Sequence, residues 1–270
     1  ILNRYRNVYF FYSHDNTSPR ENLYKYNRMW LGYQSQGLNI RLGDINKSIE
    51  SSLYGRGGSV EYEHKKIKVE VDVTHRMLNP QNNYGTVLNI NPIQNLGFTL
   101  GGAYNKGLDE NFDSKLGLIG TRFILFKNFR FGVQTSINEI KFGRSDDTTF
   151  TKRALGTTAF FDYNKKPLSI SVRYKSGQKF LNSSYNGRSE LLAQARYVFG
   201  NTSQLQYFIS DNRNSPGDYK SYKIATQPFT NIHKQLLTYG INPTPRLFIF
   251  FFFGFEFNSS DIFPVIKRGQ

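Results

Sequence analysis

The stretch IKVEVDVT, Ile67 to Thr74, alternates strictly between apolar and polar residues. Because successive side chains of a β-strand point to opposite faces, one face of this stretch is apolar and the other polar. The same alternation recurs at residues 38–42, 96–100, 129–137 and 168–175. The pattern therefore predicts an all-β chain.

The connections between the alternating segments differ in length along the chain. Short turns fall near residues 35–37, 64–66, 92–95, 127–128, 164–167 and 200–202, and longer polar connections near 13–24, 46–56, 76–83, 106–113, 141–152, 176–187 and 211–218. Short turns at one end and long loops at the other are typical of outer-membrane barrels. The fold class expected is a transmembrane antiparallel β-barrel of about 16 strands, within a range of about 14 to 18.

The expected strands have centres near residues 9, 30, 41, 61, 71, 87, 100, 120, 133, 159, 172, 194, 207, 222, 238 and 251. The strand near 222 has the weakest pattern, because Pro228 is poorly tolerated inside a ladder. Residues 1–257 are expected to form a single barrel domain, and residues 258–270 a C-terminal tail.

A soluble β-fold is the alternative, because sandwiches and small barrels also alternate. The membrane barrel is favoured because about sixteen strands in one ring leave an interior too wide for side chains to fill. Tyrosines near the expected strand ends fit an interfacial girdle; they are Tyr12, Tyr33, Tyr104, Tyr163, Tyr174 and Tyr197. The longest apolar run, residues 247–253, is far short of the roughly 20 residues of a spanning helix.

The composition narrows the function classes. The chain has no cysteine and a formal net charge of +15. No disulfide, thiolate metal site or thiol nucleophile is therefore expected. The basic residues are spread along the chain rather than clustered on one element, which disfavours nucleic acid as a partner.

If apolar side chains face lipid, the alternate positions face the lumen. These predicted pore-lining residues are Arg41, Lys68, Glu70, Asp72, Arg130, Gln134, Arg173, Lys175, Glu190, Gln194, Arg196 and Glu256. Such a net basic lining would favour anionic solutes. The alternative is that charges of both signs form ion pairs that brace a water-filled wall.

The chain offers little for catalysis. Ser13, His14 and Asp15 are the residue types of a hydrolytic triad, but adjacent residues cannot point at one another as a triad requires. His64, His75 and His233 are scattered without metal-ligand spacing. A phospholipase-type barrel would have about this length, but no His-x-Ser pair is present. Neither an enzyme nor a cofactor is expected.

A glycine-rich segment, residues 55–58 (GRGG), precedes an expected strand rather than a helix. A phosphate cradle requires a helix N-terminus at that point. Backbone freedom at a strand entrance or bulge is the role expected for these glycines.

Residues 28–62 resemble the early barrel strands of outer-membrane ushers, which show a Trp-Leu, a strand ending in Gly-Asp and an Arg-Gly that opens the next strand. Here these landmarks are residues 30–31, 43–44 and 56–57. The resemblance implies an outer-membrane barrel that passes or holds a polypeptide.

The stretch LFIFFFFGFEF, residues 247–257, has an apolar residue at every odd position. It resembles the closing strand of outer-membrane barrels and is the candidate for the last strand. That pattern normally ends a chain, so the residues after it raise the expectation that the sequence is part of a longer protein. A signal peptide is expected to be already removed or to lie outside the chain.

Three functions remain open for an outer-membrane protein of a Gram-negative bacterium. The first is a pore for solutes, with a preference for anions. The second is an usher-like secretion or assembly pore for a polypeptide, and the third is a non-conducting structural barrel in a larger complex. The partners expected are outer-membrane lipid and lipopolysaccharide, a solute or polypeptide cargo, and periplasmic or outer-membrane proteins.

Overall fold

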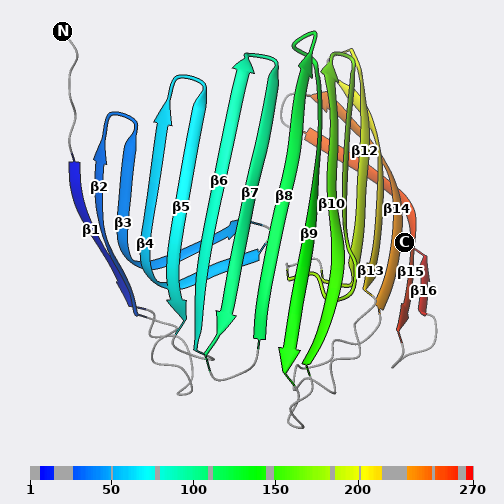
Figure 1. The fold of residues 1–270 in the computed structure, drawn as a ribbon. Coiled ribbons are helices and arrows are strands. Elements are labelled where there is room, and N and C mark those ends of the chain that lie inside the picture. Colours follow the sequence, from blue (N-terminus) through cyan, green and yellow to red (C-terminus); the bar gives the residue numbers. More distant parts are fainter. Residues whose placement is uncertain are drawn as a thin grey trace, which may run out of the picture.

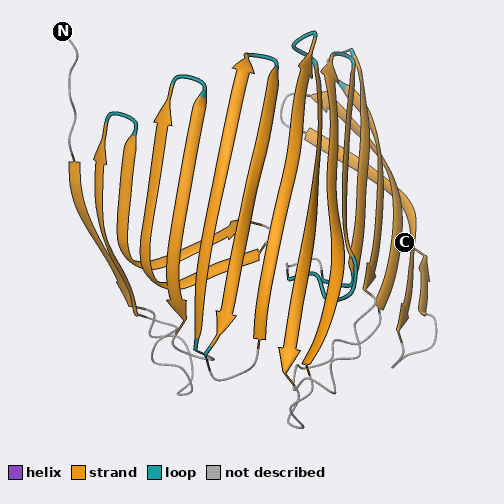
Figure 2. Cartoon of the chain, viewed as in Figure 1, coloured by secondary structure: helices purple, strands orange, loops and turns teal. Residues whose placement is uncertain are grey.

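A computed structural model describes residues 7–14, 27–49, 51–76, 80–108, 112–143, 149–182, 186–200, 202–214, 230–244, 247–260 and 266–269. These residues form strands and turns (Figure 2), and none of them belongs to a helix long and apolar enough to cross a membrane. The strands are β1 (Asn7–His14), β2 (Asn27–Ser35), β3 (Leu38–Ile49), β4 (Ser51–His64), β5 (Ile67–Arg76), β6 (Gln81–Ile93), β7 (Leu96–Gly107), β8 (Phe112–Leu125), β9 (Phe129–Gly143), β10 (Thr149–Lys165), β11 (Leu168–Gly177), β12 (Arg188–Phe199), β13 (Ser203–Asn214), β14 (Thr230–Thr244), β15 (Leu247–Ser260) and β16 (Ile266–Gly269).

All sixteen strands belong to one sheet in sequence order, and each pairs antiparallel with the next. The sheet curls into a deep trough with a convex and a concave face (Figure 1). Within the described residues, β1 pairs only with β2 and β16 only with β15. The all-β, antiparallel, barrel-type fold expected from the alternation is confirmed, and in the described residues its wall stays open between β1 and β16.

The strand near residue 222 lies outside the described residues. β15 was expected to be the last strand, and this is wrong, because residues 255–258 of β15 pair with β16. β16 itself lies inside the segment expected to be a tail, residues 258–270. The division into a barrel domain and a tail stays a prediction.

The two ends of the trough differ as the connection lengths predicted. The short connections β2–β3, β4–β5, β6–β7, β8–β9 and β10–β11 lie together at the top in Figure 1. We call this end the turn side, and the opposite end, at the bottom in Figure 1, the loop side.

The convex face is apolar over most of its height. Its exposed side chains include Val8, Phe10, Leu31, Leu42, Val60, Val71, Leu100, Ile119, Ile137, Leu155, Leu237, Phe251 and Phe253. Aromatic pairs flank this surface. Tyr84 and Tyr104 stack on the loop side, with ring centroids 6.1 Å apart, and Phe129 and Phe161 meet edge to face on the turn side, 4.9 Å apart. On β7, the segment from Leu96 to Tyr104 has the length of about 9–11 residues that a tilted strand needs to cross a bilayer.

The β3–β4 hairpin bends away from the wall and crosses the hollow of the trough (Figure 1). The bend coincides with Gly43, at φ +126°, and Gly55, at φ +148°. Both values are backbone conformations that favour glycine, and a Cβ on Gly55 would lie 2.4 Å from the His75 carbonyl oxygen. The backbone freedom expected of residues 55–58 is therefore used to turn this hairpin inward.

Candidate pore-lining face

The concave face is defined by the strand register. Residues paired directly across antiparallel strands share a face. One row of such pairs runs through Arg41, Ser59, Asp72, Gly85, Ala103, Leu116, Asn138 and Ala154. A second row runs through Gly97, Arg122, Gly132, Phe160, Arg173, Leu192, Ser210, Lys234 and Glu256. All the predicted pore-lining residues fall on this one face, by direct pairing or by even spacing along a strand.

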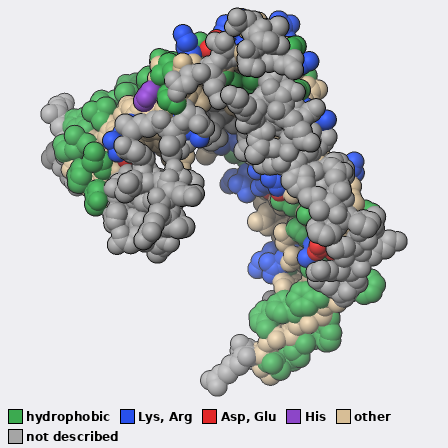
Figure 3. Space-filling model, turned by 90° about the horizontal axis from the view of Figure 1, so that it is seen from below, with side chains coloured by type: hydrophobic (Ala, Val, Ile, Leu, Met, Phe, Trp, Pro, Cys, Tyr) green, Lys and Arg blue, Asp and Glu red, His purple; other side chains and the backbone are tan. Residues whose placement is uncertain are grey.

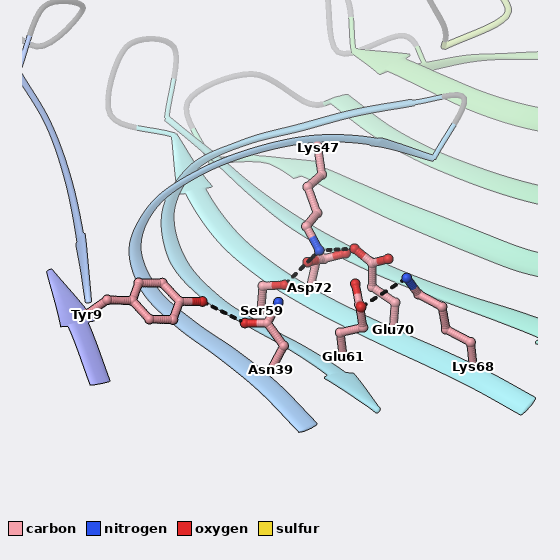
Figure 4. A network of polar contacts seen from close by, with 8 residues as sticks. All are labelled: Tyr9, Asn39, Lys47, Ser59, Glu61, Lys68, Glu70 and Asp72. Atoms are coloured by element: carbon pink, nitrogen blue, oxygen red, sulfur yellow. Dashed lines mark hydrogen bonds and ion pairs between the residues drawn. The ribbon is translucent and has the colours of Figure 1, made fainter. Parts of the chain in front are cut away.

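Acidic side chains gather where β3, β4 and β5 meet (Figure 4). Lys47, on the inward part of β3, forms an ion pair with Glu70 and lies 3.6 Å from the Asp72 carboxylate. Its ammonium also donates to the Ser59 hydroxyl over 3.0 Å. Asp72 is fully buried, so its carboxylate depends on this lysine and on nearby polar groups for stabilisation. The inward hairpin is thus attached to the wall by a charged contact.

A second ion pair lies beside this cluster. Lys68 Nζ is 2.9 Å from the Glu61 carboxylate, across the β4–β5 pair (Figure 4). Three of the predicted lining residues, Lys68, Glu70 and Asp72, are therefore engaged in ion pairs, as the bracing alternative predicts.

Basic side chains gather on the other wall, over β8 to β11. Arg173 forms an ion pair with Asp162, with Nη1 2.9 Å from Oδ1, and the Arg130 guanidinium lies 3.9 Å from the same carboxylate. The Arg173 guanidinium also covers the Phe160 ring at 5.2 Å from its centroid. Two cations thus share one carboxylate beside an aromatic surface.

Two neighbouring cavities open on this basic wall. One has a volume of about 370 Å³ and is lined by Asn89, Asn91, Gln134 and Phe160 among others. The other, of about 510 Å³, is lined by Arg130, Asp162, Arg173 and Lys175 among others. Arg122 and Phe160 line both cavities. Figure 3, a view from the loop side, shows Lys and Arg side chains in the hollow of the crescent.

Arg122 was missed as a candidate, although its position follows from the alternation of β8. Its guanidinium donates to the Asn91 amide oxygen over 3.3 Å. Among the described residues no carboxylate lies within ion-pair distance of it. The alternating stretch GTRFIL, residues 120–125, carried the signal, because it places Arg122 opposite the apolar Phe123.

The remaining predicted residues lie farther along the same face. Glu190 is 4.0 Å from Arg188, and Glu256 is 3.7 Å from Lys234. Arg196 is exposed on β12 and has no ion pair within the described part of the chain. The β15 alternation is confirmed, yet the concave side of β15 also carries Phe248, Phe250 and Phe252, which stack along the strand.

The inward part of the β3–β4 hairpin packs against an apolar patch of the concave wall. Leu53 is completely buried against Ala103, Leu116 and Leu118, with Val87 beside them. We call these five residues the inner apolar cluster. The concave face is therefore apolar here, because the hairpin covers this part of the wall and excludes water from it.

The β11–β12 connection also folds into the hollow. Leu181 is fully buried and lies so close to Gly156 that a Cβ there would be 2.7 Å from its Cδ2. Phe180 packs edge-on against Phe142, with ring centroids 6.3 Å apart. Glycine at 156 therefore provides the space in which this loop is seated.

A continuous chain of hydrogen bonds connects this loop to the wall. The Asn182 amide nitrogen donates to Asn105 Oδ1 and to the Ser114 hydroxyl, each over 2.9 Å. Asn105 donates to Asn83 over 2.7 Å, and Asn83 to the Thr74 hydroxyl over 3.1 Å. We call this hydrogen-bonded set of four asparagines and two hydroxyl residues the amide chain; its members are Thr74, Asn83, Asn105, Ser114, Asn138 and Asn182.

The other end of the amide chain returns to the same loop. Ser114 donates to Asn138 Oδ1 over 2.8 Å, and Asn138 donates to the Phe180 carbonyl over 3.0 Å. Both residues are buried. Buried polar groups need partners, so the loop and the wall satisfy each other's hydrogen bonds.

The loop-side ends of β7 to β10 invert the polarity of the rest of the sheet. Their concave positions include the buried Leu116, Ile140, Phe142 and Ala154. Their convex positions carry charged side chains instead: Lys106, Lys115, Glu139, Lys141 and Arg153. The convex surface therefore changes from apolar to charged at the level of the Tyr84–Tyr104 pair.

The motifs that suggested other chemistry have structural roles. Asp44 and Arg56, two of the usher-like landmarks, face each other across β3 and β4 and form an ion pair of 3.3 Å. His64 stacks on Tyr62, and His75 lies 2.8 Å from Asn82 Oδ1. Among the described residues no group of His, Asp or Glu could hold a metal ion. Asp15 and the side chains of Ser13 and His14 lie outside what the structure describes.

No protein-family profile and no curated protein sequence matches the chain. Solved structures do match it. The outer membrane protein OprD from Pseudomonas aeruginosa superposes with a TM-score of 0.50 at 12% identity, covering 87% of this chain and 74% of that one. OccK5 (OpdH) and OccK11 (OpdR) of the same organism each give 0.50, at 6% and 8% identity, and each covers 90% of this chain and 78% of that one.

At such identities the likeness concerns the fold alone. It agrees with the antiparallel barrel-type sheet derived from the alternation and the register. None of the three structures reported above is an usher, so the usher resemblance of residues 28–62 gains no support from them. The Asp44–Arg56 ion pair accounts for part of that pattern through local strand pairing.

Proposed function

We propose that the chain forms the wall of a solute pore in the outer membrane of a Gram-negative bacterium. The observation that carries this proposal is the division of one sheet into an apolar convex face of membrane height and a charged concave face with open cavities. Lipid contacts the first face and water fills the second. The likeness to an outer-membrane protein supports the same placement.

The solutes favoured by the pore are anions. Arg130 and Arg173 share the single carboxylate of Asp162, which leaves a surplus of positive charge beside the cavities. Arg122 and Arg196 have no carboxylate partner among the described residues. Cations that are not neutralised by a neighbour act on a passing solute, whereas paired charges mainly brace the wall.

The test is the reversal potential of the pore in a planar bilayer under a salt gradient. The native chain is expected to favour chloride over potassium. Neutralising Arg122 and Arg196 together (R122Q, R196Q) should move the reversal potential toward the cation side. The matched control neutralises two convex lysines, Lys115→Gln and Lys141→Gln, and should leave the reversal potential unchanged. An unchanged reversal potential in the R122Q, R196Q variant would show that these two arginines do not set the anion preference.

The non-conducting structural barrel is the second candidate. The observation that favours it is the pair of inward segments, the β3–β4 hairpin and the β11–β12 loop, which occupy part of the hollow. A purified protein that inserts into bilayers and never conducts would support this reading over the pore. Co-purification of a secreted polypeptide would instead revive the secretion pore.

A further inference from the structure

Three lysines on the convex surface have no partner within the described part of the chain. They are Lys106 on β7, Lys115 on β8 and Lys141 on β9, and all three are exposed. The register brings them together, because Asp113 pairs with both Lys106 and Lys141, and Lys115 lies two residues farther along β8. Three lysines on adjacent strands thus surround Asp113.

The carboxylates beside these lysines bind other groups. Asp113 accepts a hydrogen bond from the Tyr104 hydroxyl over 3.2 Å. Glu139, which pairs with Lys115 in the register, forms an ion pair of 3.0 Å with Arg153. No ion pair connects either carboxylate to Lys106, Lys115 or Lys141 among the described residues. Because the Tyr104 hydroxyl is neutral, Asp113 keeps its negative charge, and the three lysines exceed it by two positive charges.

The height of the patch on the wall identifies its surroundings. Tyr84 and Tyr104 stack beside the patch, with Tyr104 paired directly with Lys115, and Ile119 and Ile137 lie farther toward the turn side on the same convex face, 61% and 56% exposed. Apolar surface of this kind faces acyl chains, and an aromatic girdle lies at the level of the headgroups. Lysines level with the girdle, as Lys115 is, or just beyond it are therefore at the level of lipid headgroup phosphates.

We infer that Lys106, Lys115 and Lys141 form a binding site for the phosphate groups of a phosphorylated glycolipid in the outer leaflet. The glycolipid's acyl chains lie along Ile119 and Ile137, and its phosphate is held by the three ammonium groups on the outer surface of the patch. The site is on the convex face and does not depend on conduction through the concave one. It rests only on the proposed placement of the sheet in an outer membrane.

The experiment measures how much lipopolysaccharide the detergent-purified protein retains after washing, and how tightly it rebinds. The triple variant K106Q/K115Q/K141Q is expected to bind at least about tenfold more weakly, because each lysine near an anionic surface adds to the electrostatic attraction. The control variant K65Q/K127Q/K165Q removes the same charge from exposed lysines at the turn side and should bind like the native chain. Exchange of the three patch lysines for arginine should restore binding.

Two further arms distinguish the source of the phosphate. Enzymatically dephosphorylated lipopolysaccharide should bind the native chain as weakly as the triple variant binds the intact glycolipid. Free inorganic phosphate at equal concentration should fail to displace the intact glycolipid. The inference would be overturned if the triple variant bound the intact glycolipid as tightly as the native chain does. It would also be overturned if the native chain bound the dephosphorylated glycolipid as tightly as the intact one. Displacement by inorganic phosphate would overturn the assignment to a lipid. The reversal potential tests the pore separately, so the two proposals can fail independently.

Discussion

The turn-side and loop-side halves of β7 to β10 are built from the same strands with opposite polarity. In the turn-side half, the convex positions are apolar, such as Phe98 and Phe123, and the concave positions are polar, such as Thr99 and Arg122. In the loop-side half, Leu116 and Ile140 are buried on the concave side and Lys115 and Lys141 are exposed on the convex side.

The difference follows from what covers each face. In the proposed membrane placement, lipid covers the convex face only up to the Tyr84–Tyr104 pair, and convex residues from that level onward contact headgroups and water. On the concave side, the β3–β4 hairpin and the β11–β12 loop cover the loop-side half and exclude water from it. A β-strand of a membrane wall therefore follows the alternation rule only where its surroundings do not change.

The largest effect is expected from truncating the inner apolar cluster. Leu116→Ala should destabilise the folded state by about 2–5 kcal/mol, because it leaves a cavity beneath the inward hairpin. Urea unfolding in lipid vesicles, followed by the fluorescence of the single tryptophan, Trp30, measures this. Lys115→Ala on the other face of β8 is the control and should change the free energy of unfolding little. Equal effects would mean that the two faces are not differently covered.

A charge placed in the lipid-facing part of the same strand should have the next largest effect. Ile119→Lys should cost about 2–4 kcal/mol if its side chain reaches the bilayer interior. A charge is tolerated at the native Lys115 because this residue is level with the girdle, paired with Tyr104. The same unfolding experiment applies, with Ile119→Leu as the control. If Ile119→Lys left the free energy of unfolding unchanged, residue 119 would lie in water, and the proposed membrane boundary would be contradicted.

Breaking the amide chain should have a smaller effect. Asn105→Ala leaves Asn83 and Asn182 each without one partner in a buried site and should cost about 1–3 kcal/mol. It should also make the β11–β12 loop more sensitive to added protease. Asn89→Ala, which removes a hydrogen bond with Thr99 beside an open cavity, is the matched control on the turn side and should cost less. If Asn89→Ala lowered the free energy of unfolding more than Asn105→Ala, the buried amide chain would not be the more stabilising of the two sites.

The smallest effect is expected at the exposed ion pair between Arg153 and Glu139. The Arg153 side chain is 77% exposed, so solvent and salt screen the pair. Arg153→Gln should change the free energy of unfolding by less than about 1 kcal/mol. A cost of several kcal/mol would show that this part of the convex surface is covered by something other than water and headgroups.

Much of the fold follows from the sequence. Strict alternation, as in residues 67–74, requires a strand with two different surroundings, and the alternating connection lengths require hairpins. The strand centres and the shared face of the charged residues could therefore be predicted. The last strand could not, because the aromatic alternation of β15 matches a closing strand whether or not β16 follows it.

The inward segments could not be predicted from alternation, because they replace water on the concave face by protein. Leu53 lies in a stretch that reads as a polar loop, and Leu181 and Asn182 lie in another. A signal was nevertheless present in β8. Leu116 and Leu118 point to the same face of this strand as Arg122, which lies farther toward the turn side. When residues on one side of a strand change from apolar to polar along its length, a further segment of protein covers the apolar part.

The central claim is that the convex face of the sheet is in lipid between its girdles and the concave face is in water. Because the native chain has no cysteine, spin labels can be attached at single introduced cysteines along β8 in a lipid bilayer. The account predicts that labels at 119 and 123 collide mainly with oxygen dissolved in the acyl chains, whereas labels at 115 and 122 collide mainly with a water-soluble nickel chelate. Labels at 119 and 123 as accessible to the chelate as the label at 122 would contradict it.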